Sequence, residues 1–476
     1  MWGCFRHAFG GYFRLAGFVN NWRSVRHVGN RCFSRLNAGN LLSLPWLEEA
    51  SVGLIRFIYT IKLEGDHLED SNIGTHHELP SKWHQTFYTL WFGCFITGMG
   101  YSMTMPFISL FINELGHFSR FELNIYSGMA FAATFISQAI VSPYWGSLAD
   151  RKGRKLMCMR ASGVMACTIF LTGLSVNVWM IIGMRFLQGA FSGYINNSIA
   201  LMAGETPHSK SGWVMSAMTT AGVTGNLIGP LLGGTLSSAL GYRIPFFITG
   251  GLMFGVFIAT SILVKEKFTP IKKENMKPMR ELMGQIDNVQ LIVVMFVTTM
   301  LVQSSVMSIN PIVSLYVKEM MHDTGNIAFV AGIVAATPGL GNLVAASKVG
   351  HTMDRIGPQK VLTAGLLIAA VLFIPMTLTN SPWMLAFWRF LLGFANAALM
   401  PAAQTILTLE VPTEAFGRVF SYNQSFQAAG SVLGALLGST ISGLFSYSAV
   451  FAITGCTLLL DFLLVYLTQH RAKTIN

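Results

Sequence analysis

A short charged cluster between two long apolar segments holds the groups best suited to electrostatic chemistry. The run is Gly146-Ser-Leu-Ala-Asp150-Arg151-Lys-Gly153-Arg154-Lys155. A turn this short needs a residue with unusual backbone freedom, which Gly153 supplies. Asp150 can face the N-terminus of a neighbouring helix, while Arg151 and Arg154 can bind carboxylates or helix C-termini. Because such a cluster can form in one conformation and break in another, we predict a gate.

The same pattern returns in the second half of the chain, at Asp354-Arg355-Ile-Gly357. Asp354 follows Asp150 at an offset of 204 residues. A plain basic loop facing water is the alternative interpretation of both clusters. The glycine and aspartate spacing, and its repetition, favour a gate in each half.

Charges also occur inside apolar segments. Arg185 begins the run Arg185-Phe-Leu-Gln188-Gly189, and Asp461 lies in Leu458-Leu-Leu-Asp461-Phe-Leu-Leu. An ionisable residue inside a membrane is costly and needs a partner, a cavity or an interfacial position. Asp150, Arg185 and Asp461 are therefore the candidates for proton coupling. The alternatives are that Arg185 ties helices together and that Asp461 pairs with a cation or stays protonated.

The sequence contains no motif typical of an enzyme or of an ATP-driven pump. The chain lacks a Gly-x-x-x-x-Gly-Lys-Ser/Thr phosphate loop, and no histidine, acid pair or nucleophile with its base lies within an apolar segment. We therefore predict a protein that is not an enzyme and has no cofactor, with a proton gradient as its energy source. The six cysteines are sparse and do not form a disulfide framework.

The composition indicates a membrane protein. Of 476 residues, 52% are hydrophobic and only 11% are charged, with a mean hydropathy of +0.52. Soluble domains are about a quarter charged. We predict an all-α integral membrane protein with twelve transmembrane helices. They fall near residues 85–113, 124–146, 156–176, 178–203, 211–238, 243–264, 290–317, 326–348, 359–378, 382–408, 416–440 and 446–468.

The distribution of the net charge of +11 gives the orientation. Lysine and arginine concentrate in alternate loops, including Arg151–Lys155 and the stretch Lys265–Asp287. Because basic loops stay in the cytoplasm, both termini are predicted to be cytoplasmic. A basic stripe on one soluble domain would be needed for nucleic-acid binding, which we do not expect.

The two halves repeat each other. Pro106-Phe-Ile-Ser109 matches Pro311-Ile-Val-Ser314 at an offset of 205, and Arg185 matches Arg389 at 204. This predicts two parallel six-helix repeats with a binding site between them near the midplane, a geometry suited to alternating access. The two predicted six-helix bundles are residues 83–265 and 290–470, joined by a cytoplasmic linker, 266–289. Residues 1–82 are an extension of unknown role, and residues 471–476 are a cytoplasmic tail.

Glycines recur every fourth residue in the predicted fifth helix. The run is Gly225-Asn-Leu-Ile-Gly229-Pro230-Leu-Leu-Gly233-Gly234. Small residues at this spacing let a facing helix approach closely, and Pro230 kinks its own helix. The second half keeps Gly430, Gly434 and Gly438 but not the proline.

These runs together resemble three motifs of the major facilitator superfamily. The Gly146–Lys155 cluster resembles motif A, Arg185–Gly189 resembles motif B, and Gly225–Gly234 looks like motif C, the antiporter signature. The resemblance covers about residues 85–470 and is strongest to the twelve-helix drug:proton antiporter branch. In helix one the branch's second proline is replaced by Ser109, and no embedded carboxylate is present there.

The resemblance implies a proton-driven exporter of amphipathic drugs in a bacterial plasma membrane, connected with antibiotic resistance. Its expected partners are the lipid bilayer, small amphipathic molecules and protons, and we expect a monomer. A porter for a metabolite or sugar is the alternative. Polar and aromatic residues within the helices are candidates for the cavity: Tyr101, Gln138, Asn196, Asn197, Gln303, Asn310, Gln404 and Tyr422.

Overall fold

A computed structural model describes residues 83–207, 210–266, 289–411 and 416–475, and the predicted N-terminal extension lies outside these ranges. Every regular element within them is a helix. The helices are α4 (Trp83–Thr104), η1 (Met105–Phe107), α5 (Ile108–Glu114), α6 (Arg120–Lys152), α7 (Arg154–Gly173), α8 (Val178–Ala190), α9 (Tyr194–Glu205), α10 (Ser211–Leu240), α11 (Ile244–Leu263), α13 (Val289–Ile309), α14 (Val313–Met320), α15 (Ile327–Ile356), α16 (Pro358–Thr377), α17 (Pro382–Glu410), α18 (Phe416–Leu444) and α19 (Tyr447–Ile475).

Local sequence signals set the ends of α6. The Ser119 side chain accepts a hydrogen bond from the backbone of Glu122, and the Glu122 carboxylate accepts one from the backbone of Ser119, which is a capping box. At the other end Gly153 adopts φ +95° and separates α6 from α7 by a single residue. Gly357 does the same between α15 and α16, with φ +89°. The predicted turns of the two repeats therefore share one conformation.

Three of the predicted helices are interrupted. The first breaks at η1, which contains Pro106, and its counterpart in the second half breaks between α13 and α14, beside Pro311. Proline removes a backbone donor and so favours a break. The predicted fourth helix divides into α8 and α9 at residues 191–193, where Gly193 has φ +111°.

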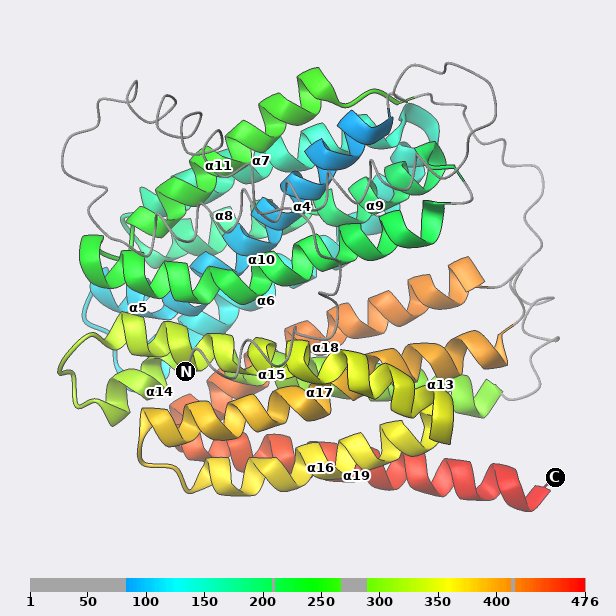
Figure 1. Ribbon diagram of the computed structural model, residues 1–476. Helices are drawn as coiled ribbons and strands as arrows, with labels where there is room; N and C mark the ends of the chain where they lie inside the picture. Colours follow the sequence, from blue (N-terminus) through cyan, green and yellow to red (C-terminus); the bar gives the residue numbers. More distant parts are fainter. Residues whose placement is uncertain (1–82, 208–209, 267–288, 412–415, 476) are drawn as a thin grey trace, which may run out of the picture. The chain divides into compact units, whose positions relative to one another are not determined.

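The helices form two groups, α4 to α11 and α13 to α19 (Figure 1, blue to green and yellow-green to red). In the first group α4 packs against α10 and α11, and α6 packs against α8. In the second group α13 packs against α18, and α15 against α17. The groups meet through α6 with α18 and α10 with α15; in addition, η1 contacts α14 and α15, and α5 contacts α14. The contact of α4 with α10 in the first group thus has its counterpart in the contact of α13 with α18 in the second.

Within the described ranges, nine helical segments are long and apolar enough to cross a membrane. Two of these are the broken segments Trp83–Glu114 and Val289–Met320. The helices α10 and α18 are long but rich in glycine, serine and threonine, and the segment Val178–Glu205 is divided between α8 and α9. The polar composition of α10 and α18, and the break between α8 and α9, therefore explain why these segments are not among the nine apolar ones.

Candidate functional site

The two helix groups meet at one end of the molecule through a reciprocal pair of hydrogen bonds. The hydroxyl of Ser109 donates to the carbonyl of Pro311, and the hydroxyl of Ser314 donates to the carbonyl of Pro106. Both serines are fully buried. The four residues are those matched by the sequence repeat, so each half contributes one serine and one proline. We call this pair of contacts the serine–proline latch.

Further contacts close the same end. Asn124 of α6 accepts a hydrogen bond from Ser442 of α18 at 3.0 Å and donates to the hydroxyl of Tyr447 at 3.4 Å. Arg120 lies over the Tyr447 ring and pairs with Glu319 at 3.5 Å. The charged groups are exposed, so their pair contributes little stability, and the buried polar contacts hold the halves together.

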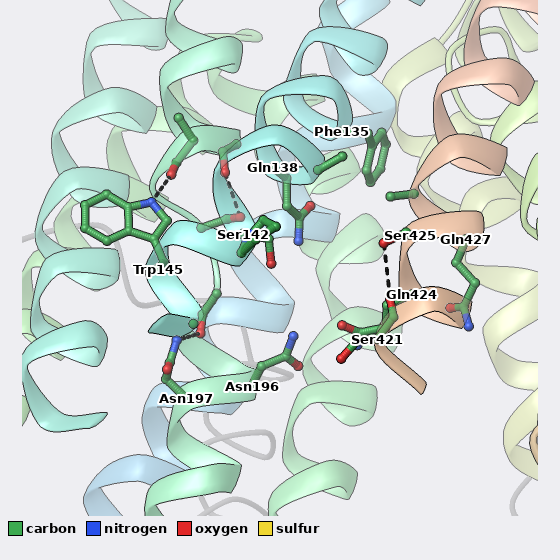
Figure 2. Close-up of a pocket in the computed structure, with 18 of the residues that line it drawn as sticks. Phe135, Gln138, Ser142, Trp145, Asn196, Asn197, Ser421, Gln424, Ser425 and Gln427 are labelled. Atoms are coloured by element: carbon green, nitrogen blue, oxygen red, sulfur yellow. Dashed lines mark hydrogen bonds between the residues drawn. The ribbon is translucent and has the colours of Figure 1, made fainter. Parts of the chain in front are cut away.

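At the opposite end a cavity of about 660 Å³ separates the halves. Side chains of α6 to α9 form one wall, and side chains of α13 and α18 form the other. Figure 2 shows Gln138 and Asn196 on one side, and Gln424 and Gln427 on the other. The cavity is bordered by Gly146 and Arg154, which belong to the basic cluster. The structure is therefore open at the end with the basic loops and closed at the serine–proline latch.

Of the predicted cavity residues, Gln138, Asn196, Asn197 and Gln303 line this cavity. Tyr101 lines an adjoining pocket of about 270 Å³, which shares Gln138 and Asn196 with it.

Three other predicted residues line neither space: Asn310, Gln404 and Tyr422. Tyr422 is on a different face of α18 from the residues that reach the cavity, and 49% of it is exposed. Asn310 lies at the break before α14, where it donates to the sulfur of Met307.

One face of α18 lines the cavity with residues that were not among the predicted ones. Ser421, Gln424, Ser425, Ala428 and Ser431 line the cavity and recur at the spacing of one helix face. That periodicity is visible in the sequence. Arg160 also lines the cavity without being among the predicted cavity residues, although it lies within the predicted span 156–176.

The basic cluster is held by a glutamate outside the predicted motif residues. Glu266 follows α11, and its carboxylate accepts hydrogen bonds from the backbone N–H groups of Arg154 at 2.7 Å and Lys155 at 2.9 Å. These are the first residues of α7, whose free N–H groups favour a negative charge. The ammonium of Lys155 donates to the carbonyl of Ser261 at 2.9 Å. The turn is thus anchored to the end of α11.

Of the other motif residues, Arg151 is exposed. Asp150 belongs to α6, but its side chain lies outside the described part of the structure. In the second repeat Asp354 and Arg355 are exposed at the end of α15.

Glu266→Gln is expected to weaken the anchor because it removes the charge that the N-terminus of α7 favours. Loss of a helix cap costs about 1 kcal/mol, so amide exchange in the first turn of α7 should accelerate roughly fivefold. Hydrogen–deuterium exchange with mass spectrometry of the 154–158 peptide measures this. Lys265→Gln is the matched control. Equal exchange in all three proteins would contradict the anchoring role.

Arg185 is fully buried in α8, and the Gln188 side chain accepts one of its hydrogen bonds, while its Nε has no partner among the described residues. Its Nη1 donates to the Gln188 side chain at 2.8 Å, and its Nη2 faces the sulfur of Met105. Its repeat counterpart Arg389 is also buried, but Nε and Nη1 have no hydrogen-bond partner among the described residues. Leu392 stands where the first half has Gln188. The repeat has therefore kept the arginine and lost its acceptor.

We expect opposite effects on stability when position 188 receives the leucine of its repeat counterpart and position 392 receives the glutamine. Gln188→Leu removes the acceptor of a buried guanidinium and should destabilise the protein by about 2 kcal/mol. Leu392→Gln offers Arg389 an acceptor at the same spacing and should raise thermal stability. Thermal unfolding of the detergent-purified variants measures both. Stabilisation by Gln188→Leu would contradict this account.

Asp461 lies away from the cavity. It is fully buried in α19, and its Oδ1 accepts a hydrogen bond from Thr298 of α13 at 2.9 Å. Its Oδ2 has no partner among the described residues.

The glycines of α10 serve two different contacts. A Cβ on Gly225, Gly229 or Gly233 would collide with α4 or the adjacent η1, at Phe95, Ser102 and Met103 respectively. Gly234 instead faces α15, close to Ala328 and Gly332. In the second half Gly430, Gly434 and Gly438 meet α13 in the same way as the first three meet α4. The repeat therefore conserves the contact within each half.

Comparison with known proteins gives the family. The Major Facilitator Superfamily family model matches residues 90–320 and 295–476. The chain is 42% identical to the multidrug resistance protein MdtG of Escherichia fergusonii, over 82% of this chain and 96% of that protein. It is also 42% identical to MdtG of Salmonella typhimurium, over 81% and 95% of the two chains.

The crystal structure of the nucleoside transporter NupG is similar with a TM-score of 0.64 at 12% identity, over 81% of this chain and 98% of that one. This likeness concerns the fold alone. With its apolar helices and its bacterial relatives, the chain is a multi-pass transporter of the bacterial inner membrane, not an enzyme. It belongs to the major facilitator superfamily.

Proposed function

We propose that this protein exports amphipathic drugs in exchange for protons by alternating access. The observation that carries the proposal is the cavity between the two halves, open at one end and closed at the other by the serine–proline latch. A site that lies between two repeats and opens to one side is the geometry of a rocking transporter. The similarity to MdtG, which is named a multidrug resistance protein, supports drugs as the substrate class.

The proposal includes twelve spans with both termini in the cytoplasm. The nine apolar segments, together with α10, α18 and the α8–α9 pair, account for twelve. The open end carries the turns at Arg151–Lys155 and Arg355–Lys360, so the positive-inside rule assigns it to the cytoplasm. We propose two bundles, 83–265 and 290–470, with 266–289 as linker and 471–476 as cytoplasmic tail. The segment 1–82 has no assigned role.

Proton coupling is assigned to three candidates, Asp150, Arg185 and Asp461, with the turns at Gly153 and Gly357 as gates. Arg185 lies beside Gln188, which lines the pocket adjoining the cavity, whereas Asp461 lines neither space. The proton gradient is the energy source, no cofactor takes part, and one chain is sufficient. Lipid, drugs and protons are the partners, and nucleic acid is not among them.

Efflux from proteoliposomes that contain only this protein tests the function. Vesicles are loaded with two unrelated fluorescent drugs, and efflux under an imposed proton gradient is compared with efflux after an ionophore collapses it. Gradient-dependent loss of both drugs is the expected result. Asp150→Asn then separates the two roles of Asp150: intact drug counterflow without gradient-driven efflux assigns coupling, and loss of both assigns gating.

A porter for a metabolite or sugar is the second candidate. The amide and hydroxyl groups along the cavity favour it, because such groups bind polar solutes. Flux of a sugar or organic acid by well-inserted protein that moves neither drug would support this candidate and overturn the efflux assignment.

A further inference from the structure

The charged side chains among the described residues that line the cavity all have one sign. Two guanidinium groups, those of Arg154 and Arg160, line it, and no aspartate or glutamate is among these lining residues. The remaining polar groups are neutral amides and hydroxyls. A cleft with charges of one sign and low-dielectric walls raises the local concentration of the opposite charge. The cavity therefore attracts anions and disfavours cations.

Arg160 is held in a fixed position on the cavity wall. Its guanidinium lies 3.8 Å from the centre of the Trp145 ring, and its Nη2 donates to the carbonyl of Ser192 at 2.9 Å. The Trp145 indole donates in turn to the carbonyl of Ala190 at 2.7 Å. The Nε and Nη1 donors of Arg160 are buried and have no acceptor among the described residues. The guanidinium is therefore a fixed positive charge on the cavity wall with no carboxylate bound to it among the described residues, and such a charge favours an oxyanion.

The break between α8 and α9 adds to the positive potential. Residues Ser192 and Gly193 line the cavity, and α9 begins immediately after them without a side-chain cap. The free N–H groups of a helix N-terminus attract negative charge. At the same break, Arg160 already occupies the carbonyls that would repel an anion.

We propose that the cavity is selective for organic anions that carry a carboxylate or phosphate, and that Arg160 is the specificity-determining residue. The anionic group binds beside the Arg160–Trp145 pair, and the body of the substrate contacts the amides of α18 across the cavity. This inference rests on the proposed export function for the direction of transport. Substrate binding itself tests it independently of transport.

The test uses two xanthene dyes of similar size and opposite charge, carboxyfluorescein and tetramethylrhodamine methyl ester. Binding to the full chain in detergent is measured by fluorescence anisotropy at neutral pH. We expect the anion to bind at least about tenfold more tightly than the cation. Arg160→Gln should weaken binding of the anion by about tenfold or more and change binding of the cation by less than about twofold. Arg160→Glu should reverse the preference.

Lys348→Gln is the matched control, because it removes one exposed positive charge from the open end without lining the cavity. If the glutamine variant fails to fold, Arg160→Lys replaces it in the test. This variant keeps the positive charge but loses the planar guanidinium, so it should retain part of the anion preference. Equal or weaker binding of the anion by the native protein, or binding of neither dye, overturns the inference. Selective anion binding without gradient-driven efflux would support the inference of anion selectivity and overturn the proposed export function.

Discussion

Replacing both latch serines, Ser109→Ala with Ser314→Ala, is expected to shift the protein from the closed to the open state at its outer end. Each substitution removes a buried hydrogen bond and leaves a buried proline carbonyl without its donor. The two losses together amount to about 2 kcal/mol, or roughly a 30-fold change in the ratio of the two states. The shift is large because the latch hydrogen bonds join the two halves, so their loss destabilises the closed state and leaves the open state unaffected.

Distances between spin labels measure this shift. His117 and Thr324 are exposed near the outer end, one in each half, and cysteines at these positions can be labelled in a background without native cysteines. Double electron–electron resonance should reveal a new, longer distance in the double variant. Ser162→Ala is the matched control, because among the described residues that buried hydroxyl bonds only to its own helix, at Cys158 and Met159. An unchanged distance distribution in the folded double variant would contradict the latch.

Gly229→Ala is expected to destabilise the N-terminal half severely. An added Cβ would meet the Ser102 hydroxyl and the backbone of Met99 and Met103 on α4. Backbone atoms cannot move aside as a flexible side chain can, so we expect a loss of about 3 kcal/mol or more. The thermal unfolding midpoint of the purified protein should fall by roughly 5 °C.

The chain supplies a close control for this substitution. Gly251 and Gly255 of α11 have open space where a Cβ would be placed. Gly251→Ala should therefore leave the midpoint unchanged or raise it slightly, because alanine favours helix more than glycine does. Equal midpoints for Gly229→Ala and Gly251→Ala would show that close packing of α10 on α4 is not required.

Much of the fold could be predicted from local patterns. Apolar segment length gave the helices, and the repeat offset correctly related Gly153 to Gly357 and Pro106 to Pro311. The ends of α6 and α19 extend beyond the predicted spans, because helical hydrogen bonds continue after the apolar residues end. The break at Gly193 was not predicted, because an isolated glycine in an apolar helix more often serves close packing.

The cavity residues could be predicted only in part. Gln138 and Asn196 were selected for polarity within a helix, and so was Tyr422, which faces away from the cavity. Polarity does not distinguish a cavity face from another helix face. The polar periodicity of α18 would have separated Tyr422 from Ser421 and Gln424, which line the cavity.

The sequence by itself determined the membrane class, the two repeated halves, the basic turns and the glycine stripes, because these depend on residues that are near in the chain or repeated at a constant offset. Only the tertiary structure decided which residues far apart in the sequence bind each other. Glu266 caps a helix that begins 112 residues earlier, and Ser109 bonds a proline carbonyl 202 residues later. Such contacts depend on where two helices cross, and the crossing is set by packing over the whole surface of both helices rather than by any short run of residues.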